Sequence, residues 1–362
     1  MKKHQFVKSV FYGGIISTIL GLSTAALALT PVEELGKNLF FDTDLSEPAG
    51  QSCASCHSPA TGFAEPDQEN PVSEGVIPGR FGGRNAPSAG YAVFFPEFTH
   101  KGRNNISGGQ FWDGRAANLT EQAKGPFLNP VEMNNPSRAH VIADIELSSY
   151  AGLFEQECGL DAFLPENVDS SYDCMAAAIA AYEGTSEVSP FSSKFDAVQA
   201  GLATFTAQEE EGFNLFKGSA KCSNCHTVKT LNNEPAPIFT DFEYHNIGLP
   251  HNPEIDALIG SVQPPDLGLG VFVVDPKNNG KFKNTHLRNV ELTAPYMHNG
   301  VLKTLKEVVN FYNTRDIPGM WPPPEVPENM DSQFVGNLGL TDAEEDAIVA
   351  FMLTLTDGYF TP

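Results

Sequence analysis

The 362-residue sequence lacks any long apolar run after its first 28 residues, because charges, prolines or glycines interrupt every later hydrophobic stretch before about 18 residues. No membrane-spanning helix is therefore expected in that part of the chain. Positive charge is also scarce, with 22 lysines and arginines against 45 acids. This balance argues against a nucleic-acid partner and favours encounter with proteins that carry a basic surface.

The first 28 residues have the pattern of a secretory signal peptide. They combine lysines at 2, 3 and 8, an apolar stretch over 11–22, and the small-residue cleavage site Ala26-Leu27-Ala28. We predict that segment 1–28 is removed on export. Its loss takes away three lysines and no acid, so the formal charge changes from −23 to −26.

The six cysteines fall into two close pairs and one distant pair. Cys158 and Cys174 stand 16 positions apart. An oxidising compartment permits a disulfide between them, which would stabilise the fold by about 3 kcal/mol in the chain-entropy model. The alternative, two buried free thiols, is less consistent with an exported chain.

Sustained alternation of apolar and polar residues is scarce, so strands are not expected to dominate. Helix starts recur instead, each with a threonine three residues before a glutamate, at Thr30, Thr206, Thr304 and Thr341. Gly, Pro and Asn crowd segments 59–110 and 229–284. The sequence predicts a mainly α protein in which long ordered loops join the helices.

A crude internal repeat divides the chain. Gly-Lys-Asn-Leu-Phe at 36–40 precedes the first close cysteine pair, and Gly-Phe-Asn-Leu-Phe at 212–216 precedes the second. The length left after export also suggests two domains. We place the domains at 29–200 and 201–362.

Each close cysteine pair belongs to a C-x-x-C-H motif. The motifs are Cys53-Ala-Ser-Cys56-His57 and Cys222-Ser-Asn-Cys225-His226. This spacing attaches haem through two thioethers and leaves the histidine to ligate iron. One copy alone is compatible with half a zinc site or a redox dithiol, but two copies in an exported chain favour two c-type haems. We predict His57 and His226 as proximal ligands.

The function depends on what occupies the other face of each iron. An open face allows peroxide chemistry, and two strong ligands favour electron transfer alone. Segment 110–133 is polar and broken by Gly and Pro, and a carboxylate there could move a proton between the oxygens of peroxide. Judged from the residues alone, however, Trp112 is a core residue and Glu132 a solvated acid.

Over essentially the whole mature chain, the sequence resembles the bacterial dihaem cytochrome c peroxidase and MauG family. The matching motifs are the two C-x-x-C-H sites, Gln110-Phe-Trp-Asp-Gly-Arg115, Gln122-Ala-Lys-Gly-Pro126, Asn129-Pro-Val-Glu-Met133 and the segment from Leu287 to Gly300. The resemblance implies two cytochrome c-like haem domains in the periplasm, with surface association left open. It also implies that the N-terminal haem is the one that reacts with peroxide.

The same resemblance implies roles for individual residues. Glu132 would be the distal acid-base, Gln122 its partner in the pocket, and Trp112 the bridge between the haems. A calcium ion between the domains would be held by Asn85, Thr293 and Pro295, which without the resemblance are only turn residues.

Tyr312 bears on the branch of the family. It lies on the apolar stripe 305, 308, 309, 312 of a predicted helix and so points inward. The resemblance implies methionine here in ordinary family peroxidases and tyrosine in MauG-like proteins, where it ligates the second haem. A tyrosinate would stabilise higher iron oxidation states. The alternative is a core tyrosine with a hydrogen-bonded hydroxyl.

The sequence departs from the family patterns in two places. Segment 80–84 holds no histidine that could cap the N-terminal haem. His100 in the next loop could ligate instead, but it is by default a surface residue. Ala220 stands where MauG has a tryptophan through which electrons leave the substrate protein. The other tryptophan, Trp321, lies in a Pro-rich loop and suits packing or exposure, so an identical electron route is not implied.

Three functions follow in order of preference. The first is a MauG-like enzyme that reacts with hydrogen peroxide at the N-terminal haem and, through Trp112 and the second haem, oxidises tryptophan or tyrosine in a partner protein. The second is a peroxidase that reduces hydrogen peroxide to water with electrons from a small cytochrome c or a cupredoxin. The third is a non-enzymatic dihaem electron carrier.

Overall fold

The computed structural model describes residues 1, 28–102 and 105–360, and within them the chain is mainly helical, as predicted. The predicted signal peptide lies almost wholly outside these residues. The helices are α1 Pro31–Phe41, α2 Cys53–Cys56, α3 Leu119–Ala123, α4 Gly125–Leu128, α5 Arg138–Leu147, α6 Ala151–Cys158, α7 Val168–Glu183, α8 Lys194–Gln199, α9 Ala207–Lys217, α10 Pro253–Ile259, α11 Leu269–Phe272, α12 Leu305–Thr314 and α13 Asp342–Leu353. Among the described helices, none is long and apolar enough to cross a membrane.

Strands are short and pair locally. β1 (Thr99–His100) pairs antiparallel with β2 (Ile106–Ser107), and β3 (Tyr244–His245) pairs antiparallel with β4 (Phe282–Lys283). Most of the remaining chain is loop, including much of the Gly-, Pro- and Asn-rich segments. These loops run through the middle of the molecule, where the site lies.

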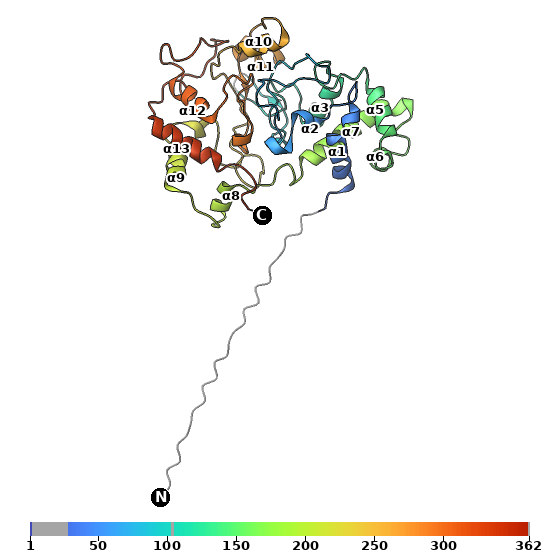
Figure 1. Cartoon of the computed structure of the whole chain (residues 1–362), viewed down its shortest axis with the longest axis horizontal. Coiled ribbons are helices and arrows are strands. Elements are labelled where there is room, and N and C mark those ends of the chain that lie inside the picture. The colour runs from blue at the N-terminus through green and yellow to red at the C-terminus, as the bar shows by residue number, and fades with distance from the viewer. Residues whose placement is uncertain (2–27, 103–104, 361–362) are drawn as a thin grey trace.

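Two large and two smaller hydrophobic clusters form the interior of the described part of the chain, and the two large ones follow the two halves of the sequence. The first is built from buried residues between Leu35 and Val188 and the second from buried residues between Phe195 and Leu355. Figure 1 shows α1, α5, α6 and α7 on one side of the molecule and α9, α12 and α13 on the other. Phe195 of α8 already packs in the second cluster. The division into domains at residue 200 stays a prediction.

The threonine caps are where the sequence predicts them. α1, α9, α12 and α13 each begin one residue after the threonine. In α12 the Thr304 hydroxyl accepts from the Glu307 N–H (3.1 Å), and the Glu307 carboxylate accepts from the Thr304 N–H (3.0 Å). Each such box satisfies backbone donors that a helix start leaves free.

The repeated glycines explain why the two halves share a pattern. Gly36 of α1 lies against the backbone of α7, and Gly212 of α9 lies against the backbone of α13. A Cβ on Gly36 would overlap the Ala178 carbonyl, and one on Gly212 would overlap the Ala347 carbonyl. Each half therefore uses a glycine in the helix that precedes its C-x-x-C-H motif to let that helix cross a later helix closely.

The predicted disulfide between Cys158 and Cys174 is confirmed and joins the end of α6 to α7. Replacing both cysteines with alanine is expected to lower the free energy of unfolding by about 3 kcal/mol, because the unfolded chain regains the freedom of the open loop. Urea unfolding followed by circular dichroism measures this change. The bond lies away from the cavity described below, so the haem absorbance should not change; an unaltered urea midpoint would contradict the prediction.

Candidate active site

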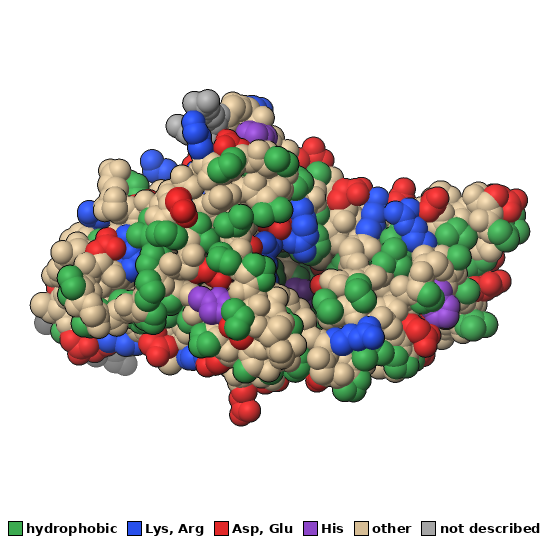
Figure 2. Space-filling model, turned by 90° about the horizontal axis from the view of Figure 1, so that it is seen from above, with side chains coloured by type: hydrophobic (Ala, Val, Ile, Leu, Met, Phe, Trp, Pro, Cys, Tyr) green, Lys and Arg blue, Asp and Glu red, His purple; other side chains and the backbone are tan. Residues whose placement is uncertain are grey.

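Both C-x-x-C-H motifs open onto one cavity of about 630 Å³. The predicted site residues also line it: Cys53, Cys56, His57, Asn85, Trp112, Gln122, Glu132, Cys222, Cys225, His226, Thr293, Pro295 and Tyr312. In the space-filling view of Figure 2 the surface is hollowed near its middle, with Lys or Arg side chains at the edge of the hollow. The fold thus brings together residues that lie up to 259 positions apart in sequence.

The first motif presents its histidine in a ligating orientation. α2 holds both cysteines, and His57 follows directly. The Nδ1 atom of His57 lies 3.2 Å from the Phe63 carbonyl oxygen, so Nδ1–H donates and Nε2 keeps a free lone pair. Burial lowers the pKa of His57, which keeps the ring neutral. A neutral imidazole with a fixed tautomer is the form that binds iron.

The second motif repeats this arrangement. Nδ1 of His226 lies 2.9 Å from the Phe239 carbonyl oxygen, and burial again lowers the pKa of the imidazole. Phe63 and Phe239, the two acceptors, both have a left-handed backbone, with φ of 59° and 62°. That conformation is uncommon for a bulky residue and persists only where the surrounding structure holds it in place. The internal repeat therefore extends to the orientation of each histidine.

Glu132 lies on the cavity wall, which favours the catalytic role over the solvated one. Its carboxylate accepts a hydrogen bond from Asn129 Nδ2 at 2.7 Å. Burial raises the pKa of Glu132, while the Asn129 bond and the charge of Arg115 oppose the rise. A carboxyl group with a raised pKa is better suited to give and take a proton. Gln122, on α3, lines the same cavity.

Trp112 is held by its ring nitrogen and by its backbone. Its Nε1–H donates to the Asn85 carbonyl at 2.8 Å, and its own carbonyl accepts from the Lys283 N–H at 2.8 Å. Its ring meets that of His298 edge to face, and His298 stacks on Phe282 with 3.5 Å between ring centroids. The indole is therefore fixed in one orientation on the wall of a cavity that both motifs share.

Tyr312 projects from α12 into the cavity. Among the described residues its hydroxyl makes no hydrogen bond, which removes the support for the alternative of a hydrogen-bonded core tyrosine. Burial, as the largest cause, raises its pKa, and negative charge at Cys225 and Cys222 would raise it further. A tyrosinate here at neutral pH needs a cation beside the oxygen.

The three residues predicted to hold calcium all line the same cavity. Asn85 and Pro295 are buried and Thr293 is partly buried. The Asn85 amide donates to the Pro71 carbonyl at 3.1 Å. This bond turns the side-chain oxygen of Asn85 away from Pro71 and leaves it, among the described residues, without a hydrogen bond.

Three residues considered where the sequence departs from the family patterns, His100, Ala220 and Trp321, can be located in the structure. His100 is exposed in β1 and does not line the cavity. Ala220 is 1% exposed, so its methyl group does not reach the surface. Trp321 packs edge to face on Phe311 and donates from Nε1 to the Thr314 hydroxyl at 2.9 Å. Trp321 therefore has a packing role.

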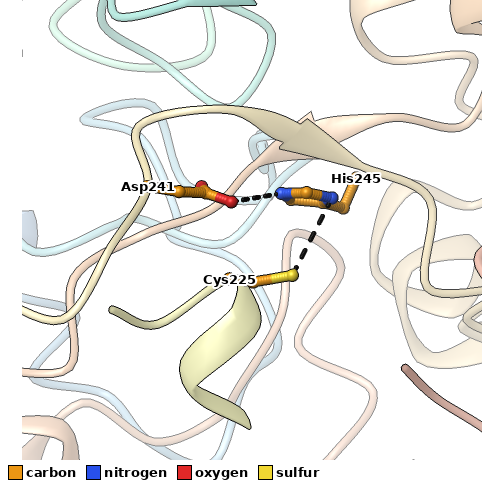
Figure 3. A group of neighbouring side chains, drawn as sticks. All are labelled: Cys225, Asp241 and His245. Carbon is orange, nitrogen blue, oxygen red and sulfur yellow. Dashed lines mark hydrogen bonds and ion pairs between the residues drawn. The ribbon is translucent and has the colours of Figure 1, made fainter. Parts of the chain in front are cut away.

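The sequence interpretation did not anticipate the group formed by Cys225, Asp241 and His245 (Figure 3). His245 Nε2 lies 2.8 Å from Asp241, and its Nδ1 lies 3.9 Å from the Cys225 sulfur. Burial lowers the pKa of His245, but the Asp241 bond outweighs it and the pKa rises to about 10. The spacing of Asp241 and His245 gave no signal, because a distant loop brings them to the motif. Since Cys225 belongs to the C-x-x-C-H motif and is predicted to anchor haem, this group is not assigned as a separate metal site.

Glu183, at the end of α7, is a second acid that sequence patterns did not reveal. It is 4% exposed, lines the cavity, and its Oε2 has no hydrogen-bond partner among the described residues. Burial raises its pKa from 4.5 to about 8. A buried carboxylate without partners is costly, so the side chain is neutral over most of the physiological range.

The Glu183 shift predicts a pH-dependent stability. The pKa of Glu183 is higher in the folded than in the unfolded protein. Its contribution to the free energy of unfolding is therefore complete below pH 4.5 and is lost as the pH rises toward 8. Over this whole window the loss is on the order of 5 kcal/mol. Glu183→Gln is expected to reduce the fall in melting temperature between pH 5 and pH 8. Glu166→Gln, at an exposed position, is the control and should keep the wild-type fall. If the melting temperature falls equally between pH 5 and pH 8 in the wild type, Glu183→Gln and Glu166→Gln, Glu183 is not a buried, neutral acid.

Comparison with known proteins agrees with this geometry. The family profile described as di-haem cytochrome c peroxidase matches residues 31–204. The chain is 40% identical to methylamine utilization protein MauG of Paracoccus denitrificans, over 91% of this chain and 89% of that protein. It is 35% identical to cytochrome c551 peroxidase of Pseudomonas aeruginosa, over 76% and 70%. The chain belongs to the dihaem cytochrome c peroxidase and MauG family.

Solved structures show the same relationship. The diheme peroxidase BthA of Burkholderia thailandensis superposes with a TM-score of 0.81 at 33% identity, covering 93% of this chain and 88% of that one. A MauG-like protein associated with microbial copper homeostasis gives a TM-score of 0.71 at 29% identity, covering 92% and 91%. Members of the family are haem peroxidases that act on hydrogen peroxide, and this chain is an enzyme of that kind.

Two c-type haems follow from the family, and the residues present fit them. Each motif supplies two cysteines and a neutral histidine at the wall of one cavity, whose lining is largely apolar around a few polar groups. His57 and His226 would hold the irons, and the cysteines the porphyrin edges.

Proposed function

We propose that this dihaem enzyme is MauG-like: it is exported to the periplasm, reacts with hydrogen peroxide beside His57 and Glu132, and oxidises tryptophan or tyrosine side chains of a partner protein. The observation that carries the proposal is Tyr312, which faces the second motif from α12 with a hydroxyl that makes no hydrogen bond to the described residues. The similarity to a methylamine utilization protein and to a MauG-like protein supports the same branch.

The chain's own residues supply proton transfer and positioning. When bound, the haems supply iron that peroxide oxidises and that keeps the oxidising equivalents for later use. Glu132 moves a proton from one oxygen of hydrogen peroxide to the other, so that one oxygen leaves as water. Asn129 orients the Glu132 carboxylate, and Gln122 provides an amide to the same pocket. No histidine lies in segment 80–84 to block access.

Trp112 would transfer electrons, and Tyr312 would ligate the second iron. Trp112, fixed by Asn85 and the Lys283 backbone, carries electrons between the two halves of the cavity. Tyr312 would bind the second iron through its oxygen, and the positive charge of the iron would overcome the raised pKa of the buried hydroxyl. A hard anionic ligand favours an oxidised iron, which suits an enzyme that stores oxidising equivalents.

Peroxide titration of the fully ferric protein tests this function. Addition of hydrogen peroxide should change the absorbance of both haems without prior reduction, and the protein should return to its starting spectrum as a partner side chain is oxidised. A ferric protein whose spectrum does not respond to peroxide would contradict the proposal.

A second function is favoured by Ala220. This residue is buried and has no aromatic ring, so the route by which MauG draws electrons from its substrate has no equivalent there. A peroxidase that takes electrons from a small cytochrome c or a cupredoxin does not need that tryptophan. If peroxide reacts only after one haem is reduced, and a reduced cytochrome is then consumed, this second function replaces the first.

We also propose that Asn85, Thr293 and Pro295 hold one calcium ion. The side-chain oxygen of Asn85 and backbone carbonyls of the other two are ligands that a hard cation prefers. Removing the metal with EGTA is expected to lower the melting temperature of the holoenzyme, and added calcium should restore it. Metal analysis that finds no calcium in the purified protein, or a melting temperature insensitive to EGTA, would exclude this site.

A further inference from the structure

Lys283 is a buried lysine with no acidic partner in the described part of the chain. It lies on β4, is 7% exposed, and lines the cavity. Its ammonium donates to two neutral oxygens, the Gly109 carbonyl at 3.2 Å and the Gln110 side-chain oxygen at 3.4 Å. It also lies 4.4 Å from the centre of the Phe95 ring. Among the described residues it forms no salt bridge.

Asp113, the acid whose charge acts on Lys283, is already paired with two arginines. Asp113 accepts from Arg84 Nη1 at 2.7 Å and from Arg115 Nη1 at 2.9 Å. Burial lowers the pKa of Lys283 to about 7, and the charge of Asp113 opposes this only in part. An isolated buried ammonium costs several kcal/mol of solvation. The contrast with Arg288 is informative, because that fully buried cation is paired with Asp196.

We propose that Lys283 binds a haem propionate, so that the carboxylate missing from its surroundings comes from the cofactor. Each haem carries two propionates, and the cavity lined by Lys283 is the one that both C-x-x-C-H motifs share. The neutral oxygens of Gly109 and Gln110 hold two of the three ammonium hydrogens, which leaves one for the propionate. The backbone of Lys283 is also joined to that of Trp112, whose carbonyl accepts from the Lys283 N–H at 2.8 Å.

The reduction potentials of the two haems test this pairing in the holoenzyme. Lys283→Met has a similar shape without the charge, and it is expected to shift one haem about tenfold toward the ferric form, which is about 59 mV for a one-electron couple. Lys283→Arg retains the charge and should keep both potentials. Lys277→Met is the control at an exposed position and should also keep both. Unchanged potentials of both haems in a fully loaded Lys283→Met protein would overturn the proposal.

A measurement on the unaltered enzyme covers the case in which Lys283→Met does not fold or load haem. With lysine side chains labelled with ¹⁵N, the Lys283 ammonium should give a signal that moves when the nearby haem changes oxidation state. The proposal fails if no lysine ammonium signal depends on the oxidation state of either haem. Neither measurement depends on which partner the enzyme oxidises. The pairing of Lys283 with a propionate can therefore fail while the proposed function holds, and the proposed function can fail while the pairing holds.

Discussion

Replacement of Glu132 with glutamine is expected to slow the reaction with hydrogen peroxide by roughly 100-fold or more. Glutamine keeps the size of the side chain and can still bond to Asn129, but it cannot take up and return a proton. Because burial raises the pKa of Glu132, the wild-type carboxyl takes up a proton more readily than an exposed glutamate does. The loss should therefore appear in the rate of reaction and not in the binding of haem.

Stopped-flow absorbance of the ferric holoenzyme after mixing with peroxide measures this rate. Glu121→Gln is a suitable control, because Glu121 lies on α3 near Gln122 but is 50% exposed and pairs with Lys124. The control should react at the wild-type rate. A Glu132→Gln protein with both haems bound and a rate within a few-fold of wild type would remove Glu132 as the acid-base.

The local chemistry of the fold could be predicted from the sequence, because it depends on residues close together in the chain. The four capping boxes, the C-x-x-C-H motifs and the disulfide each lie within 17 residues, and the structure confirms the helix starts and the disulfide. The repeat at Gly36 and Gly212 was visible in the same way. Its cause, the close crossing of α1 with α7 and of α9 with α13, required the structure.

The composition of the cavity wall could not be predicted from residue patterns, because loops without periodicity build it. Lys283, Glu183 and His245 are each ordinary in sequence, and only the tertiary fold buries Lys283 and Glu183 without a charged partner among the described residues and places His245 between Asp241 and the second motif. For Glu132 and Trp112 the residues alone pointed to surface and core, and only the family resemblance suggested a catalytic position. The structure brings both to the cavity, yet their roles stay predictions until the variants are measured.

Replacement of Tyr312 with phenylalanine is expected to change the ligand field of one haem only. Phenylalanine keeps the ring that packs in the second cluster and removes the oxygen that would bind iron. Absorbance and electron paramagnetic resonance of the ferric protein should show one haem altered and the other as in wild type. Oxidation of the partner protein should fall by at least tenfold, because the second iron loses the ligand that favours its oxidised form.

Tyr296→Phe separates ligation from the general loss of a buried hydroxyl. Tyr296 is also buried in the second cluster, but its hydroxyl donates to the Val290 carbonyl at 2.9 Å. This variant should lose some stability and keep both haem spectra. Tyr312→Met adds a test in the opposite direction, since a thioether should raise the potential of the second haem and move the enzyme toward the behaviour of an ordinary family peroxidase. If Tyr312→Phe and Tyr296→Phe both keep the wild-type spectra, Tyr312 is a packing residue, and the case for protein oxidation over plain peroxide reduction loses its main support.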